Sequence, residues 1–174
     1  MRHYTPGKFA SGLPEDAQIA LDLALYQPDI AQNTGSMLRL GACLGVPIHI
    51  IHPTGFPFSK KAVKRGGLDY LDHAEFIEHD SYAHFTAWRQ ATGRRLVLLT
   101  TKGAVSAYAA EYKEGDVLMV GRESAGVPDA VAEAADLRVR IPMQASMRSL
   151  NVAMAASLVL GEALRQSGHF LTLT

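Results

Sequence analysis

The sequence predicts an α/β fold in which a largely parallel sheet is flanked by helices. Short apolar runs of strand length recur along the chain, and stretches of helical composition separate them. Strands that alternate with helices in this way are typical of parallel sheets. Between Ile19 and Leu25 the large apolar residues occupy every second position, which indicates a first strand covered on both faces.

The remaining elements follow from local signals. Pro28 ends the first strand, and Asn33 is expected to cap a helix that runs to about Leu44. Further strands are expected at 47–53, 95–100, 116–121 and 137–142. Further helices are expected near 60–65, 80–91, 105–111, 128–135 and 147–167. The sequence contains no internal repeat that would indicate a second unit.

The chain is expected to form a single domain at 18–174, preceded by a flexible N-terminal extension at 1–17. The extension is rich in Gly, Pro and polar residues and lacks a hydrophobic period. A chain of 174 residues, 48% hydrophobic and 20% charged, is sufficient for one core. The single cysteine, Cys43, excludes an internal disulfide and is expected to be a buried structural thiol. No apolar run has the length of a signal peptide or membrane span, so a cytoplasmic location is expected.

The last predicted helix is apolar on nearly every side. Between Leu150 and Leu160 only Asn151 and Ser157 are polar, so the helix must be covered almost all round. A second subunit would provide this cover, which predicts a homodimer. Burial within the monomer is the alternative.

Three loops follow predicted strands, where open α/β sheets bind ligands. They span 100–103, 121–126 and 141–149, and their backbone groups are available to bind a ligand. The sequence contains neither the G-x-G-x-x-G dinucleotide motif after the first strand nor a P-loop. It also lacks the G-x-S-x-G motif of hydrolases.

Several polar residues in these segments have both a structural and a functional interpretation. Asn33 is explained equally well as a helix cap and as a site residue. Arg39 is either a solvated helix arginine or a contact to phosphate or ribose, since a guanidinium presents fixed donors. Glu123 is either a surface carboxylate or part of the site. Ser149 and Asn151 either satisfy the amino end of the last helix or gather with the others.

The overall charge does not indicate a nucleic-acid partner, so RNA binding would have to rest on local clusters of basic residues. Lysine plus arginine and aspartate plus glutamate each total 17, so the formal net charge is zero. A solvated charged face is the usual explanation of such a basic run, and the alternative is a phosphate-binding patch made of Lys60, Lys61, Lys64, Arg65, Arg94, Arg95 and Lys102. The 7 histidines lack metal-ligand spacing, so no metal is expected.

Three segments together resemble the SPOUT class of RNA methyltransferases. They are NTGSMLRL at 33–40, MVGRESAG at 119–126 and IPMQASMRSLNVA at 141–153. The likeness extends over about 18–167 and is strongest to the small tRNA 2'-O-methyltransferases that modify the wobble nucleotide. The basic segment HIIHPTGFPFSKKAVKRGGLDYLD, at 49–72, is also similar to theirs.

The resemblance implies a trefoil-knot site for S-adenosylmethionine, without a metal, in a homodimer that acts on tRNA. The implied substrate is the wobble cytidine or modified uridine, in leucine isoacceptors. By similarity the cofactor contacts are Leu99, Gly121, Ile141 and Ser149. By similarity Arg39 serves catalysis, surrounded by Asn33, Glu123, Ser149 and Asn151.

Two residues depart from the pattern of the family. Arg122 stands where relatives usually have proline, and Ala125 stands where they often have arginine, which affects the expected RNA contacts of this loop. The alternatives are a 2'-O-methyltransferase of another tRNA or rRNA position, a non-catalytic RNA-binding module of the same fold, and an unrelated nucleotide-dependent α/β enzyme.

Overall fold

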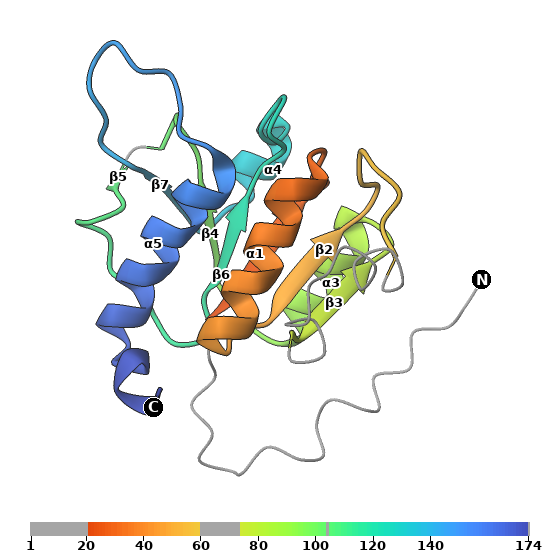
Figure 1. Cartoon of the computed structure of the whole chain (residues 1–174), viewed down its shortest axis with the longest axis horizontal. Helices are drawn as coiled ribbons and strands as arrows, with labels where there is room; N and C mark the ends of the chain where they lie inside the picture. The colour runs from red at the N-terminus through yellow and green to blue at the C-terminus, as the bar shows by residue number, and fades with distance from the viewer. Residues whose placement is uncertain (1–20, 60–73, 104, 174) are drawn as a thin grey trace.

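A computed structural model describes residues 21–59, 74–103 and 105–173 and contains one parallel sheet (Figure 1). The strand order is β3-β2-β1-β6-β4-β7-β5, and every pairing in it is parallel. The strands are β1 Asp22–Tyr26, β2 Ile48–Ile51, β3 Phe76–His79, β4 Leu96–Leu99, β5 Val105–Ser106, β6 Val117–Val120 and β7 Leu137–Arg140. The sequence-based prediction of an α/β fold with a largely parallel sheet is therefore confirmed.

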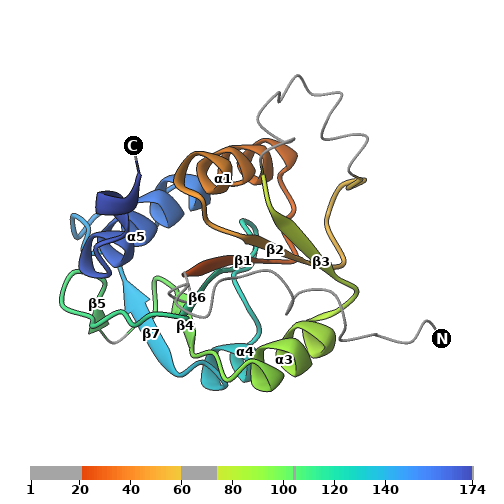
Figure 2. The same cartoon turned by 90° about the horizontal axis from the view of Figure 1, so that it is seen from below.

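Helices cover both faces of this sheet. They are α1 Ala31–Leu44, α3 Tyr82–Ala91, α4 Asp129–Glu133 and α5 Val152–Gln166, followed by the short 3₁₀ helix η2 His169–Thr172. Figure 2 shows α1 and α5 on one face and α3 and α4 on the other. Within the described ranges, no helix has the length and apolar character needed to cross a membrane.

Burial on both faces explains the apolar character of the central strands. All five residues of β1 are buried. Leu23 and Leu25 join the core beneath α1 and α5, whereas Ala24 and Tyr26 join the core on the opposite face. Successive side chains of a strand point to opposite faces, so a strand covered twice must be apolar at nearly every position.

Several predicted boundaries were wrong. Helix α1 begins at Ala31, with Ile30 as N-cap and no side-chain cap, so Asn33 does not cap it. The segment predicted as a helix at 105–111 instead contains β5, whose Val105 pairs with Val139 of β7. The last helix starts at 152 rather than 147.

Two further differences concern single features. Strand β3 was not predicted, and Cys43 is exposed rather than buried. The predicted helix at 60–65 and the extension at 1–17 lie outside the described residues.

A pair of histidines is buried at the face of the sheet that α3 covers. His49 Nδ1 lies 2.8 Å from His79 Nε2, and His49 Nε2 lies 3.0 Å from an Asp22 carboxylate oxygen. Arg94 pairs with the same oxygen at 2.7 Å, and the Trp88 ring centroid lies 4.2 Å from that of His49. Burial, reinforced by the nearby His49, lowers the pKa of His79 to about 4.

We expect acid to destabilise the fold through His79. Unfolding restores its pKa to the ordinary value of 6.5, so the unfolded chain binds the proton first. This contribution to stability is complete above that value and is lost as the pH falls toward about 4. In denaturant titrations, the free energy of unfolding of His79→Gln should fall by about 1–3 kcal/mol less than that of the wild type as the pH is lowered through this range. His52→Gln, at a partly exposed histidine that pairs with Glu78, is the matched control, and equal pH dependence in all three proteins would contradict the assignment.

Candidate functional site

A cavity of about 460 Å³ opens at the carboxyl ends of β4 and β6. The three loops that follow β4, β6 and β7 surround it, at the upper edge of the molecule in Figure 1, together with the first turns of α1 and α5. All four residues expected to contact a cofactor line the cavity, namely Leu99, Gly121, Ile141 and Ser149. Its size and mixed apolar and polar lining are typical of a small-molecule site.

A chain of side-chain hydrogen bonds crosses the cavity wall and joins three distant segments. Asn151 Nδ2 donates to Asn33 Oδ1 at 3.0 Å, and Asn33 Nδ2 donates to Glu123 Oε1 at 3.2 Å. All three residues line the cavity. Asn151 Oδ1 also accepts from the backbone N–H groups of Ala153 and Met154, so the same side chain caps α5. The structural and functional interpretations of Asn151 are therefore compatible.

The loop after β6 is a tight turn closed on itself. Arg122 and Gly126 exchange two backbone hydrogen bonds of 2.9 Å, and Gly126 has a φ of 65°. A Cβ atom added to Gly121 would lie 2.7 Å from the Gly126 carbonyl carbon, so only glycine fits there. This close approach gives the loop one shape against the cavity.

Asp29 is a site residue that the sequence did not indicate. Its backbone N–H donates to Glu123 Oε2 at 3.0 Å, and its side chain accepts from the Glu123 N–H at 3.1 Å and from the Ser124 hydroxyl. Hydrogen bonding with Glu123 and Ser124, with the Arg122 guanidinium nearby, holds the pKa of Asp29 below its usual range. Asp29 follows β1 by three residues, at the same edge of the sheet as the cavity, but its contacts could not be foreseen because its partners are 94 and 95 residues away.

Arg39 is the one predicted site residue that does not line the cavity. It lies exposed on α1 and is not among the residues that line the cavity. It lies six positions after Asn33, which corresponds to about 9 Å along a helix axis. The structure therefore brings Asn33, Glu123, Ser149 and Asn151 to one cavity and places Arg39 outside it.

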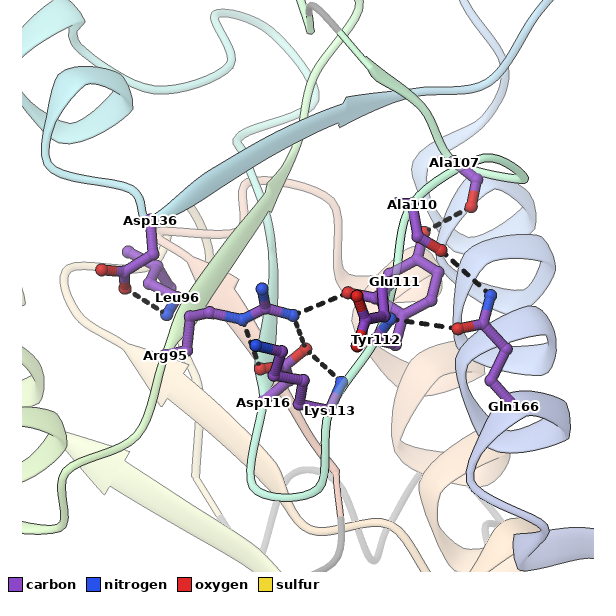
Figure 3. A network of polar contacts seen from close by, with 10 residues as sticks. All are labelled: Arg95, Leu96, Ala107, Ala110, Glu111, Tyr112, Lys113, Asp116, Asp136 and Gln166. Carbon is purple, nitrogen blue, oxygen red and sulfur yellow. Dashed lines mark hydrogen bonds and ion pairs between the residues drawn. The ribbon is translucent and has the colours of Figure 1, made fainter.

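The predicted basic patch is not formed by Arg94 and Arg95. Both precede β4, at the edge of the sheet opposite to Lys102, and both are in ion pairs with aspartates. Arg95 pairs with Asp116 at 2.6 Å (Figure 3). The stretch Lys60–Arg65 lies outside the described residues.

The polar network of Figure 3 anchors α5 at this opposite edge. The Gln166 side chain accepts from the Tyr112 N–H and donates to the Ala110 carbonyl, both at 3.0 Å. Tyr112 donates its hydroxyl to the Ala107 carbonyl at 2.7 Å, and burial raises the pKa of this tyrosine to about 12. These contacts fix the far end of the helix whose first turn lines the cavity.

The chain is similar to known proteins along most of its length. Residues 20–161 match the SpoU rRNA Methylase family. A relative from Beijerinckia indica subsp. indica, named tRNA (cytidine(34)-2'-O)-methyltransferase, is 58% identical over 146 residues, which cover 84% of this chain and 91% of the relative.

Solved structures have the same arrangement. One that concerns "structural insights into the 2-OH methylation of C/U34 on tRNA" has a TM-score of 0.78 and 42% identity, and the match covers 86% of this chain and 97% of the other. The SpoU methyltransferase AviRb from Streptomyces viridochromogenes, in complex with AdoMet, has a TM-score of 0.76 and 28% identity, covering 86% of this chain and 61% of the other. Because the family match covers residues 20–161, most of the chain, this protein belongs to the SpoU rRNA Methylase family.

Proposed function

We propose that the protein transfers a methyl group from S-adenosylmethionine to the ribose 2'-hydroxyl of the wobble nucleotide of tRNA. The observation that carries the proposal is the Asn151–Asn33–Glu123 chain on the wall of a cavity of cofactor size. The wobble position is supported by relatives of 54% and 58% identity that are named for cytidine 34. We expect the substrate to be cytidine or a modified uridine in leucine isoacceptors, and the protein to act in the cytoplasm.

The cavity fits S-adenosylmethionine in size and chemistry. Leu99, Ile141 and Val152 supply apolar surface for a nucleoside ring, and the turn at Gly121–Gly126 supplies backbone groups for polar contacts. We assign the cofactor contacts to Leu99, Gly121, Ile141 and Ser149. The trefoil knot expected around this site stays a prediction.

The reaction needs alignment more than covalent help from the protein. Bound S-adenosylmethionine would supply an electrophilic methyl carbon, which bonds to the ribose 2'-oxygen as its bond to sulfur breaks. Holding two reactants in line lowers a barrier by up to ~7 to 11 kcal/mol. The hydroxyl must also lose its proton to a base or to water.

The polar residues have different roles in this proposal. Each Glu123 oxygen already accepts a hydrogen bond, so we assign Glu123 to orient the Asn33 amide rather than to remove the proton. Asn33, Ser149 and Asn151 line the cavity and would position the ribose. A guanidinium with a pKa above ~12 is a poor base, so Arg39, which lies outside the cavity, is assigned to hold the phosphate beside the reacting ribose.

Mass spectrometry of tRNA tests the substrate. In a deletion strain, 2'-O-methylation at the wobble nucleotide of leucine tRNA should disappear and return when the gene is restored. Loss of a methyl group from another nucleotide, with wobble methylation intact, would contradict the proposed substrate but not the proposed reaction. An unchanged methylation pattern, without cofactor binding in calorimetry, would instead contradict the methyltransferase proposal.

We also propose a homodimer that covers the outer face of α5. Met154 and Leu158 follow one another by one helical turn and are 60% and 45% exposed. Ala156, on the same helix, is only 1% exposed because it packs in the core of its own chain. A charge at Ala156 would therefore test folding and not assembly.

We expect Leu158→Glu to convert the dimer to a folded monomer. A carboxylate in an apolar interface is buried without a partner, which destabilises association by several kcal/mol or more. Light scattering should give a dimer for the wild type and the 18.8 kDa species for the variant. Ala87→Glu is the control, because Ala87 is exposed on α3, which covers the opposite face of the sheet, and this variant should remain dimeric. A wild-type protein that is monomeric at micromolar concentration would remove the proposal.

A further inference from the structure

We infer that Asp29 is a positioning residue: it locks the loop after β6 onto the start of α1 and thereby fixes the Glu123 and Asn33 side chains in the cavity wall. The inference rests on the proposed methyl transfer for its kinetic consequence. Its structural basis is independent of the substrate, because it consists of contacts between the chain's own residues.

The contacts between Asp29 and the loop are reciprocal. The Asp29 N–H donates to Glu123 Oε2 at 3.0 Å, and the Glu123 N–H donates to Asp29 Oδ1 at 3.1 Å. The other Asp29 oxygen accepts from the Ser124 hydroxyl and lies 3.5 Å from Arg122 Nε. One aspartate thus contacts three successive residues of the loop, with both its backbone and its carboxylate. Hydrogen bonds to charged groups are about twice as strong as neutral ones.

The backbone before Asp29 is held in the conformation that this clamp requires. Gln27 has a φ of 43°, which is unusual for a residue other than glycine and persists only where the surroundings enforce it. The Gln27 N–H donates to the Ile51 carbonyl, and the Gly55 N–H donates to the Pro28 carbonyl. These bonds turn the chain sharply between β1 and α1, so the Asp29 N–H faces the loop.

The loop after β2 also leaves no room for Asp29 to move. A Cβ atom added to Gly55 would lie 2.6 Å from the Asp29 Cβ and 2.8 Å from its Cα. Gly55 therefore packs directly against the aspartate. This contact offers a way to displace Asp29 without altering its carboxylate.

The clamp determines how Glu123 presents itself to the cavity. With Oε2 engaged by the Asp29 N–H, Oε1 accepts from the Asn33 amide, whose own oxygen then accepts from Asn151. A continuous chain of hydrogen bonds thus runs from Asp29 through Glu123 and Asn33 to Asn151 at the start of α5. Asp29 does not line the cavity, so its effect on the reaction passes through these residues.

Kinetics of Asp29 variants test the inference. We expect Asp29→Ala to lower kcat by about 10- to 100-fold, since small misplacements of positioning groups have effects of this size. The Kd for S-adenosylmethionine, measured by calorimetry at full stoichiometry, should change less than about 3-fold, because Asp29 lies outside the cavity and the two Arg122–Gly126 backbone bonds that shape the turn remain. Asp29→Asn keeps an acceptor for the Glu123 N–H and should recover part of kcat.

A double-mutant cycle separates positioning from a general loss of structure. If Asp29 acts through Glu123, adding Asp29→Ala to a Glu123→Ala protein should lower kcat little further, whereas independent effects would multiply. Gly55→Ala should reproduce the kcat loss of Asp29→Ala. The exposed Asp129→Ala in α4 is the matched control and should keep wild-type kcat.

A readout without turnover completes the test. The side-chain amide signals of Asn33 and Asn151 in NMR spectra should move toward those of solvated asparagine in Asp29→Ala and in Gly55→Ala, and stay in place in Asp129→Ala. Unchanged amide signals together with wild-type kcat in Asp29→Ala would overturn the inference. A wild-type protein without activity on tRNA, whose amide signals nonetheless shift in Asp29→Ala, would contradict the proposed function alone.

Discussion

Gly121→Val is expected to abolish cofactor binding and methyl transfer together. The added Cβ would lie 2.7 Å from the carbonyl carbon and 2.8 Å from the Cα of Gly126, and backbone atoms cannot turn aside as a flexible side chain can. The loop would open at the Arg122–Gly126 bridge and lose its fit to the cavity that it lines. Calorimetry should show the Kd for S-adenosylmethionine rising about 100-fold or more, a loss of roughly 3 kcal/mol.

The steric origin of this effect can be separated from a general loss of stability. Gly121→Ala already carries the offending Cβ and should produce most of the loss in affinity. Gly161→Ala, in α5, is the matched control, because a Cβ there meets nothing within 4 Å and alanine favours a helix by about 1 kcal/mol. Wild-type cofactor affinity in Gly121→Val would exclude the loop after β6 from the cofactor site.

The central sheet could be predicted because its signals are local. In β1 and β6 every residue is buried, so apolar runs identify these strands without any knowledge of their neighbours. Their carboxyl ends then indicate the ligand-binding edge, since the ends of parallel strands lie together. This reasoning found the loops after β4, β6 and β7 that surround the cavity.

Elements at the sheet edges could not be predicted in the same way. Strand β5 has two residues, and its alanine-rich continuation favours a helix until pairing with β7 overrides that preference. In β3, Phe76 and Ile77 are followed by Glu78, so the apolar signal is short. Partners in these cases lie far along the sequence.

The site itself was predicted in part by position and in part by resemblance. Asn33, Glu123 and Asn151 stand in three segments, and only folding brings them into hydrogen-bond distance. The resemblance named all three, whereas spacing alone left each with a structural explanation. Asp29 escaped both arguments, because its importance comes from contacts with the loop after β6 and not from its own surroundings in the sequence.

Arg39→Ala is expected to lower kcat/KM for methyl transfer by about 100-fold or more. The Kd for S-adenosylmethionine should stay within about 3-fold of the wild-type value. Arg39 is exposed on α1 and does not line the cavity, so its removal takes no side chain from the cofactor site. In the proposed mechanism its guanidinium holds the phosphate beside the reacting ribose, which fixes the hydroxyl relative to the methyl group. Turnover assays with leucine tRNA measure the first effect, calorimetry with S-adenosylmethionine measures the second, and filter binding measures the affinity for the tRNA.

Arg39→Lys distinguishes the charge from the shape of the donor. Lysine keeps the positive charge but lacks the planar fork of donors, so we expect RNA affinity near the wild type and kcat between that of the wild type and that of Arg39→Ala. Lys113→Ala removes a positive charge at the opposite edge of the sheet and should change neither. A parallel fall in cofactor affinity and activity in Arg39→Ala would contradict the division of labour, because the arginine would then act on the cofactor site and not on the RNA.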